Sequence, residues 1–443
     1  MCRHCDSCKS KKSKGCSCNF FFDAVGDHNY DETARNFNRI LIDEVINVEK
    51  PKFVVHAGDI AGPDPAGFAV VAQGWLPTAI TAAQQLPSRT FWWTLNSPFF
   101  VTPGDNDWSD TIRAPGGPLP PGPAPYPPNP NPLATLADFR DVFYNQGMNV
   151  QPCFTVVSQP DEQLKYSEFV ENKRWVYRNI VFVTVHTVSG NNGLNPSASP
   201  FPSAMKDVKN ETATAIFVGS IAGNTLTVTS MDPDSLPIAV GQDLTSHYNA
   251  GNGVRFLTTI TAFGTGTGGV GTYTVSGAPQ VVNSTDMFAG GRINANLSWL
   301  SRAYDVADQI KARGLVIITQ ANMGLQTNTI TTGFTAMASM MRDRTLAKTP
   351  EELQVLLIRG DAHLYVIQKP LPNQGTFPPL NVATPSTYFL SNFTEVGVPG
   401  GNVMATNPPI AGSNRLGGVG RVKISVDFCT IGLFNFYNSL DTL

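Results

Sequence analysis

Apolar residues along the chain occur in short continuous runs that end in small or acidic residues. From residue 20 onward, buried strands are predicted for the runs FFFDAVG, KFVVHAG, SPFFVTPG and RNIVFVTVH. The later runs LVIITQ and QVLLIRG have the same character. Continuous rather than alternating apolar runs are typical of parallel strands that are covered on both faces.

Helical periodicity lies between these strands. Apolar residues recur at helical spacing from Ala34 to Val48, and Asp31 is a candidate N-cap for that helix. A longer amphipathic helix is predicted over NANLSWLSRAYDVADQIKAR, with Gly314 as its C-cap, and a shorter one over 333–346. The order predicts an α/β domain with a largely parallel sheet. The C-terminal runs GRVKISVDF and IGLFNFY alternate, as antiparallel strands do.

Two segments interrupt the α/β pattern. Residues 114–132 are so rich in proline that they predict a semi-rigid surface loop. Gly and Thr dominate the second segment, 213–290, and TLTVTS alternates with period two. The only basic residue between Lys209 and Arg292 is Arg255. The pattern predicts a small all-β module inserted into the α/β domain, either as a spacer or as a binding module.

Composition narrows the class of protein. Of the 443 residues, 42% are hydrophobic and 15% are charged, which excludes a wholly disordered chain. The net charge of -3 argues against bulk binding to nucleic acid. No apolar run reaches the 18 or more residues, roughly, that a transmembrane helix requires.

The N-terminal segment concentrates cysteine and lysine. Five of the 7 cysteines fall between Cys2 and Cys18, in the spacing CxxCxxC followed by CxC. These thiolates either hold a zinc ion or are incidental to a solvated basic tail. No apolar stretch typical of a secretory signal follows them, so we expect no classical secretion. A cytoplasmic or virion-associated location is the expectation.

Every Gly-Asp dipeptide follows an apolar strand: Asp27, Asp59, Asp105 and Asp361 each occupy this place. Ligands of open parallel sheets bind beyond the carboxyl ends of the strands, so these carboxylates are expected to lie together there. Four carboxylates in a partly dry cleft repel one another, and bound cations remove that conflict. The alternative is that each aspartate caps the helix that follows it.

Two histidines occupy matching positions. His186 ends the strand RNIVFVTVH, and His363 lies two residues after Asp361. Mixed carboxylate and imidazole ligands suit Mn, Fe or Zn. Two such ions that share one carboxylate polarise a phosphoryl group and generate hydroxide near neutral pH. The predicted cofactor is therefore a pair of divalent or trivalent metal ions.

The order of these motifs resembles that of the calcineurin-like metallophosphoesterase superfamily. The segments PGDNDW, ENKRW, VTVHTVSGNN, TQAN and RGDAHLYVIQKPL are similar to one branch of it, over residues 20–210 and 291–437. The resemblance implies a four-layer α/β/β/α sandwich with a dinuclear metal site at the strand ends. The segment 213–290 is similar to a Gly/Thr-rich β repeat unit. The division implied is a Cys/Lys-rich tail (1–19), a first part of the phosphoesterase domain (20–212), the insertion (213–290) and a second part (291–443).

The resemblance also assigns roles. It implies a hydrolase that cleaves a phosphate ester by attack of a metal-bound hydroxide. The first metal would be held by Asp27 and His363, Asp59 would bridge both metals, and the second would be held by Asp105, His186 and Asp361.

Departures from the family pattern affect the proton donor and the substrate contacts. Asn106 stands where the family has the histidine that protonates the leaving group, and an amide cannot do so. His28 is either a substitute donor or a solvated loop residue. Tyr30 is a candidate metal or substrate contact, and Arg113 either clamps a phosphate or lies on the surface.

A second function is therefore also open from the sequence. The loss of the usual histidine at Asn106, together with the long proline loop, favours a catalytically weak or inactive structural or attachment protein. Such a protein would present residues 213–290 to a protein or surface partner. The sequence defines neither the substrate nor a preference for monoesters or diesters.

Overall fold

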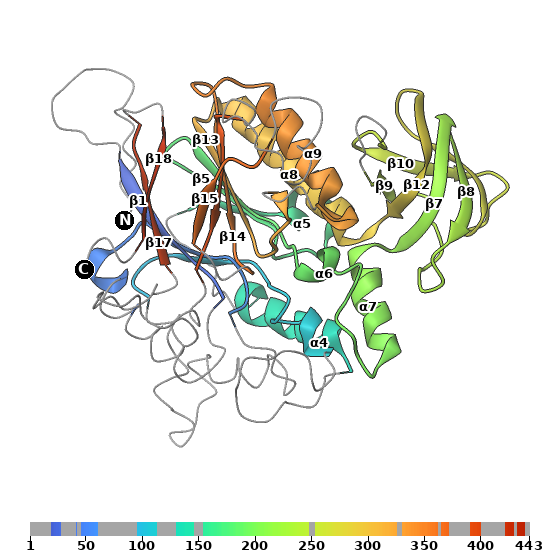
Figure 1. Ribbon diagram of the computed structural model, residues 1–443, viewed down its shortest axis with the longest axis horizontal. Helices are drawn as coiled ribbons and strands as arrows, with labels where there is room; N and C mark the ends of the chain where they lie inside the picture. Colours follow the sequence, from blue (N-terminus) through green and yellow to red (C-terminus); the bar gives the residue numbers. More distant parts are fainter. Residues whose placement is uncertain are drawn as a thin grey trace, which may run out of the picture.

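The computed structural model of the protein (Figure 1) describes residues 19–27, 41, 46–60, 95–112, 130–145, 154–247, 253–325, 330–361, 365–371, 390–399, 421–428 and 432–438. Several sequence predictions lie outside these residues: the N-terminal cysteines, the Asp31 cap, residues 114–129 of the proline loop, His28, Tyr30, Arg113 and His363.

The first sheet has five strands in the order β18-β17-β1-β2-β3. Its strands β1, β2 and β3 are parallel, as their continuous apolar runs predict. The two C-terminal strands add antiparallel to β1, as their alternating pattern predicts. The bounds are β1 (Phe20–Val25), β2 (Val54–His56), β3 (Phe99–Val101), β17 (Arg421–Val426) and β18 (Phe434–Asn438).

The second sheet has seven strands in the order β15-β16-β14-β13-β6-β5-β4. Its four central strands are parallel, and the strands at both edges are antiparallel. The bounds are β4 (Val156–Ser158), β5 (Lys173–Tyr177), β6 (Ile180–Thr184), β13 (Gly314–Thr319), β14 (Gln354–Arg359), β15 (Val366–Gln368) and β16 (Phe393–Gly397).

An aromatic core joins the two sheets face to face. The ring of Phe53 on the first sheet lies 5.1 Å from Phe22 and 4.9 Å from Phe182 of the second sheet. Trp175 stacks on Phe100 across the interface at 3.7 Å between ring centroids. These large buried rings contribute heavily to stability, at about 25 cal/mol for each Å² of apolar surface removed from water.

Two long helices cover the other face of the seven-stranded sheet: α8 (Gly291–Ile310) and α9 (Thr332–Leu346). The residues of β13 explain this arrangement, because Leu315 and Ile317 face the helices while Val316 and Ile318 face the first sheet. The prediction of a helix over 333–346 is confirmed.

The predicted end of α8 is wrong. The helix stops at Ile310, and Lys311 takes the left-handed conformation at its C-cap with φ 51°. Gly314 instead begins β13, where a Cβ would meet the side chains of Ile180 and Leu433 at 2.9 Å. The glycine therefore lies in close packing at the start of a strand rather than at a helix end.

The expected four-layer α/β/β/α sandwich is also wrong. The described residues form two mixed sheets face to face, with the long helices on the outer face of the seven-stranded sheet, and a separate closed β-barrel. The expectation came from the resemblance to metallophosphoesterases. Between β1 and β2, however, the described helical residues amount to the short α2 (Asn47–Glu49) and single π-helical positions.

Shorter helices lie between the strands along the chain. They are η4 (Ser109–Ile112), α4 (Pro132–Arg140), η5 (Asp141–Asn145), α5 (Gln159–Glu162), η6 (Leu164–Tyr166), α6 (Ser189–Asn192) and α7 (Pro202–Thr212). None of the helices in the described ranges combines the length and the hydrophobicity needed to span a bilayer.

Six strands between α7 and α8 form a closed barrel in the order β10-β11-β8-β7-β12-β9. Closure removes free strand edges, and thirteen buried residues, among them Phe217, Leu226 and Tyr273, fill its interior. Ala215 pairs with Ala289, so the two strands that connect to the rest of the chain lie side by side. The bounds are β7 (Ala215–Gly223), β8 (Thr225–Met231), β9 (Asp243–Ser246), β10 (Thr258–Phe263), β11 (Gly271–Val275) and β12 (Gln280–Ala289).

The paired ends and the separate core predict that the barrel can be removed. Joining Thr214 to Gly290 through two glycines should leave a cooperatively folding body, although Lys165 and Tyr166 lose their partner Asp243. We expect a Tm within about 8 °C of that of the full chain, since each kcal/mol lost shifts Tm by roughly 2–4 °C. Differential scanning calorimetry measures this, and an aggregated product without a cooperative transition would contradict it.

Candidate functional site

Four aspartates lie at the carboxyl ends of the strands of both sheets. The backbone N–H of Asp361, after β14, donates a hydrogen bond to Asp27 Oδ2 (2.9 Å), after β1. Asp59, after β2, is close enough to Asp27 and Asp105 for their charges to raise its pKa. The structure therefore brings together these four predicted residues, which share one rim of the molecule.

The glycine of each Gly-Asp dipeptide allows the turns to approach one another. A Cβ on Gly104 would lie 2.0 Å from Asp59 Oδ1, and one on Gly58 would lie 2.9 Å from the Cα of Gly104. A Cβ on Gly360 would lie 3.0 Å from Asp27 Oδ2. Larger residues at these three positions would separate the turns, which explains the glycine before Asp59, Asp105 and Asp361.

The backbone at three of these aspartates is left-handed. Their φ angles are 52° at Asp27, 56° at Asp59 and 66° at Asp361. Residues with a side chain pay on the order of 1–2 kcal/mol for this conformation, although aspartate tolerates it better than most. Strained positions of this kind cluster at functional sites, and here all three lie at the same rim.

Asp107 connects two of the turns without being one of the four. Its Oδ2 accepts hydrogen bonds from the backbone N–H groups of Gly104 (2.8 Å) and Asp59 (3.0 Å). Both donors are buried, so the carboxylate satisfies groups that water does not reach. Asp107 therefore fixes the turn after β2 against the turn after β3.

The surroundings of Asp59 disfavour the ionised form of its carboxyl group. The side chain is fully buried, and burial raises the pKa of its carboxyl well above the usual value. The charges of Asp105, Asp27 and Asp107 raise that pKa further, in decreasing order of effect. A carboxylate in such surroundings is stabilised by a bound cation or by hydrogen-bond donors.

Two side-chain amides supply donors to this cluster. Asn106 donates from its backbone N–H to Asp59 Oδ1 (3.1 Å) and from Nδ2 to Asp59 Oδ2 (3.2 Å). Gln320, directly after β13, donates from Nε2 to Asp59 Oδ2 (3.1 Å) and to Asp105 Oδ1 (2.8 Å). Sequence reasoning missed Gln320, although its place at the end of the run LVIITQ was the available signal.

His186 does not contribute to the aspartate cluster as predicted. Its Nδ1 lies 2.7 Å from Glu171 Oε1, and its Nε2 accepts a hydrogen bond from Trp108 Nε1 (3.1 Å). Burial and the charge of Arg292 lower its pKa, and Glu171 only partly opposes that effect. Both ring nitrogens are therefore engaged within the protein in this arrangement, and metal ligation by His186 stays a prediction.

Buried charge pairs hold the surroundings of His186. Glu171 accepts a bidentate interaction from Arg140, with oxygen–nitrogen distances of 2.6 and 2.9 Å. Arg140 and His186 lower the pKa of Glu171 despite its complete burial, so it stays ionised. Arg292 donates to the carbonyl oxygen of His186 (3.0 Å). Trp108, which is fully buried, belongs to this packing rather than to the wall of an open pocket.

The donors at the rim decide which metals fit. The described oxygen donors are the carboxylates of Asp27, Asp59, Asp105 and Asp361 and the amides of Asn106 and Gln320. Oxygen donors suit hard cations such as Mg²⁺, Mn²⁺ or Ca²⁺. Within the described ranges, no three His, Cys, Asp or Glu side chains are already arranged as the ligands of one ion. The residues fit an oxygen-binding cation chemically, but the side chains must turn to enclose it.

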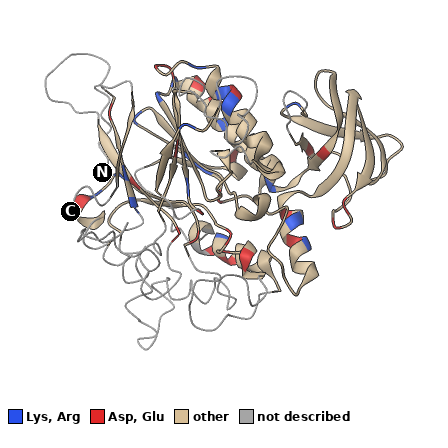
Figure 2. Cartoon of the chain, viewed as in Figure 1, with Lys and Arg blue, Asp and Glu red and all other residues tan. Residues whose placement is uncertain are grey.

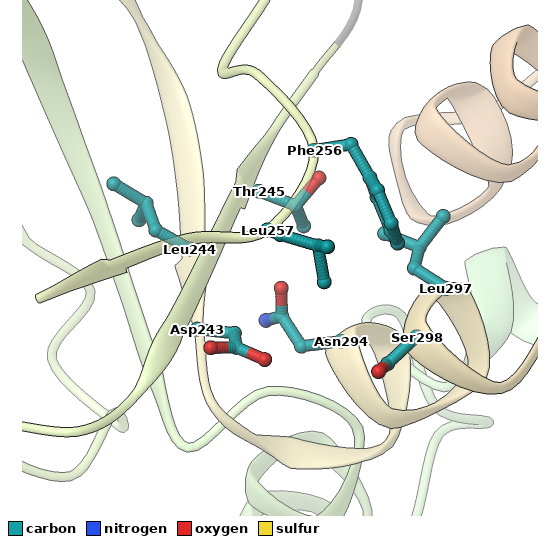
Figure 3. A pocket seen from close by; sticks show the side chains of 8 residues that line it. All are labelled: Asp243, Leu244, Thr245, Phe256, Leu257, Asn294, Leu297 and Ser298. Atoms are coloured by element: carbon teal, nitrogen blue, oxygen red, sulfur yellow. The ribbon is translucent and has the colours of Figure 1, made fainter. Parts of the chain in front are cut away.

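Two cavities lie away from the aspartates, between the barrel and the helices. A small one is lined by Asp243, Phe256 and Leu257 of the barrel and by Asn294, Leu297 and Ser298 of α8 (Figure 3). The other measures about 440 Å³ and lies between barrel residues such as Arg255 and Val281 and helix residues such as Met340 and Arg344.

Comparisons with known proteins leave the family open. No protein-family model and no curated protein sequence matches this chain. One similar solved structure is described as "GAP50 the anchor in the inner membrane complex of Plasmodium", with 10% identity and a TM-score of 0.36. That match covers 95% of this chain and 88% of the other. A likeness at this level carries no functional argument, so the resemblance to metallophosphoesterases stays a prediction.

Asp107 provides a test of how the two turns are held. Asp107→Ala should lower the free energy of unfolding by about 2–6 kcal/mol, because two buried N–H groups lose their acceptor at about 1–3 kcal/mol each. Asp107→Asn keeps an acceptor oxygen and should cost about 1 kcal/mol. Urea unfolding measures both. Asp110→Asn, at a buried aspartate bonded to Ser197 (2.8 Å), is the control; equal losses for all three variants would contradict the assignment.

Proposed function

We propose that the protein is a hydrolase that cleaves phosphate esters and depends on divalent cations. The observation that carries this proposal is the convergence of Asp27, Asp59, Asp105 and Asp361 at the carboxyl ends of the strands. Buried like charges at one place favour cation binding, and paired cations are suited to phosphoryl groups. The resemblance of the motif order to metallophosphoesterases supports the same function.

The residues at this rim have different proposed roles. When bound, divalent cations polarise the phosphoryl group and lower the pKa of water. Asp59 lies centrally, within the influence of Asp27 and Asp105, and is the candidate bridging ligand. Asn106 Nδ2 is placed beside Asp59 to donate a hydrogen bond to a phosphoryl oxygen. An amide releases no proton at neutral pH, so Asn106 orients the substrate and does not protonate the leaving group.

Hydrolysis of an aryl phosphate and an aryl phosphodiester, with Mn²⁺ or Mg²⁺ added, tests the proposal. Asp59→Asn should lower kcat/KM by about 10²–10³-fold, the usual cost of losing one group that stabilises transition-state charge. The matched control is Asp23→Asn, a buried aspartate of β1 that pairs with Arg421 at 2.9 Å; it should change the rate by no more than a few-fold. A metal-loaded wild-type protein that cleaves neither ester would refute the hydrolase.

A second function is favoured by a different observation. Amide donors already engage Asp59 and Asp105, and both ring nitrogens of His186 are occupied, as in a weak or inactive site. The barrel meanwhile carries few charged residues (Figure 2) and exposes apolar side chains, with Val281 79% and Leu257 59% exposed. These features support a structural or attachment protein whose working surface is the barrel.

Surface variants separate this function from hydrolysis. Val281→Asp and Leu257→Asp should abolish association with a stoichiometric partner isolated from the native source and leave ester hydrolysis unchanged, because both side chains lie on the barrel. Thr227→Asp, at an exposed polar position of β8, is the control. Analytical ultracentrifugation of purified components measures the association. Association that persists in both apolar variants would remove the barrel as the attachment surface.

A further inference from the structure

Gln320 occupies the space between two carboxylates. Its Nε2 donates to Asp59 Oδ2 (3.1 Å) and to Asp105 Oδ1 (2.8 Å), and its side chain is fully buried. The stem of Gln320 fits because Gly58 has no side chain, since a Cβ there would lie 2.6 Å from both Cβ and Cγ of Gln320. The position is therefore built into the fold by a glycine and a glutamine from opposite sheets.

The side-chain amide of Gln320 offsets the repulsion between the two carboxylates, as a bound cation does. Its two N–H groups place partial positive charge between Asp59 and Asp105, whose mutual repulsion raises the pKa of Asp59. The opposite end of the same amide is not satisfied. Gln320 Oε1 is buried and has no hydrogen-bond partner among the described residues. A buried acceptor without a donor is costly, so this arrangement leaves a reason for the amide to turn.

Rotation of the terminal amide by 180° exchanges the places of Nε2 and Oε1. The oxygen would then face Asp59 and Asp105, which is favourable only if a positive ion lies between them. Asp59 also accepts hydrogen bonds from Asn106, at 3.1 Å from the backbone N–H and 3.2 Å from Nδ2, and these contacts do not involve the amide of Gln320. One amide can therefore turn while the other holds Asp59 in place.

We propose that Gln320 is a cation-responsive amide of this site. It holds the carboxylates of Asp59 and Asp105 together in the cation-free protein and presents Oε1 as a neutral ligand when a divalent cation binds. This inference rests on the cation site of the proposed function and adds a selectivity to it. An amide oxygen in place of an imidazole nitrogen favours Mg²⁺ and Mn²⁺ over Zn²⁺.

Two substitutions of Gln320 should act in opposite directions on cation binding. Gln320→Glu replaces the donor with a further carboxylate, so the cation-free protein should melt at a lower temperature and bind Mn²⁺ at least about tenfold more tightly. Gln320→Met removes both donor and ligand oxygen, so the cation-free protein should also melt lower but bind Mn²⁺ at least about tenfold more weakly. The ratio of Zn²⁺ affinity to Mn²⁺ affinity should be smaller for the wild-type protein than for Gln320→His.

Isothermal titration with Mn²⁺ and Zn²⁺, together with thermal melts of chelator-treated protein, measures these effects without reference to hydrolysis. The control is Gln354→Met, at a buried glutamine of β14 that donates to Pro350 O (2.8 Å) away from the aspartates. If Gln320→Glu does not fold without a cation, it is refolded in Mn²⁺ and titrated with chelator.

The outcomes separate this inference from the hydrolase. Opposite shifts in Mn²⁺ affinity support the role of Gln320, even if no phosphate ester is cleaved, in which case the hydrolase alone fails. Shifts in the same direction for both variants, or shifts as small as that of Gln354→Met, would overturn it. A wild-type protein that binds none of Mg²⁺, Mn²⁺ and Zn²⁺ would overturn it as well.

Discussion

Mutual repulsion among buried carboxylates is the constraint on which this rim of the molecule depends. It acts on Asp59, because burial and the neighbouring aspartates all disfavour the charge of that carboxylate. Hydrogen-bond donors offset this repulsion. The backbone N–H of Asn106 donates to Asp59, that of Asp361 donates to Asp27, and the amide of Gln320 donates to Asp105. Buried carboxylates this close together are stabilised by a bound cation or by hydrogen-bond donors that take its place.

The strands and the placement of their aspartates followed from the sequence, because both signals are local. A continuous apolar run is sufficient to indicate a buried strand, and a Gly-Asp pair after it marks the carboxyl end. The function of the glycines was not local. Gly104 and Gly58 are needed because another turn or Gln320 lies against them, and those neighbours are distant in the chain.

Other features of the structure depend on contacts between residues that are distant in the chain. The local sequence around a histidine at a strand end is the same whether its ring ligates a metal or forms hydrogen bonds within the protein. Trp108, which donates a hydrogen bond to His186, lies 78 residues away in the chain. Gln320 lies in the segment TQAN, but nothing local to that segment indicates that its amide reaches Asp59 and Asp105, which are distant in the chain. The layered sandwich was implied by the resemblance, whereas in the structure α8 and α9 cover apolar residues of β6, β13 and β14 on one face of the seven-stranded sheet.

The barrel and the aspartate rim are separate parts of the fold, built from different strands. The barrel has its own interior, closes on itself, and enters and leaves the chain through the paired residues Ala215 and Ala289. No described carboxylate of the rim belongs to it. A change in the barrel surface therefore need not disturb Asp59 or Gln320, and weakening of the rim need not unfold the barrel. The two proposed functions, hydrolysis and attachment, thus rest on separate parts of this fold.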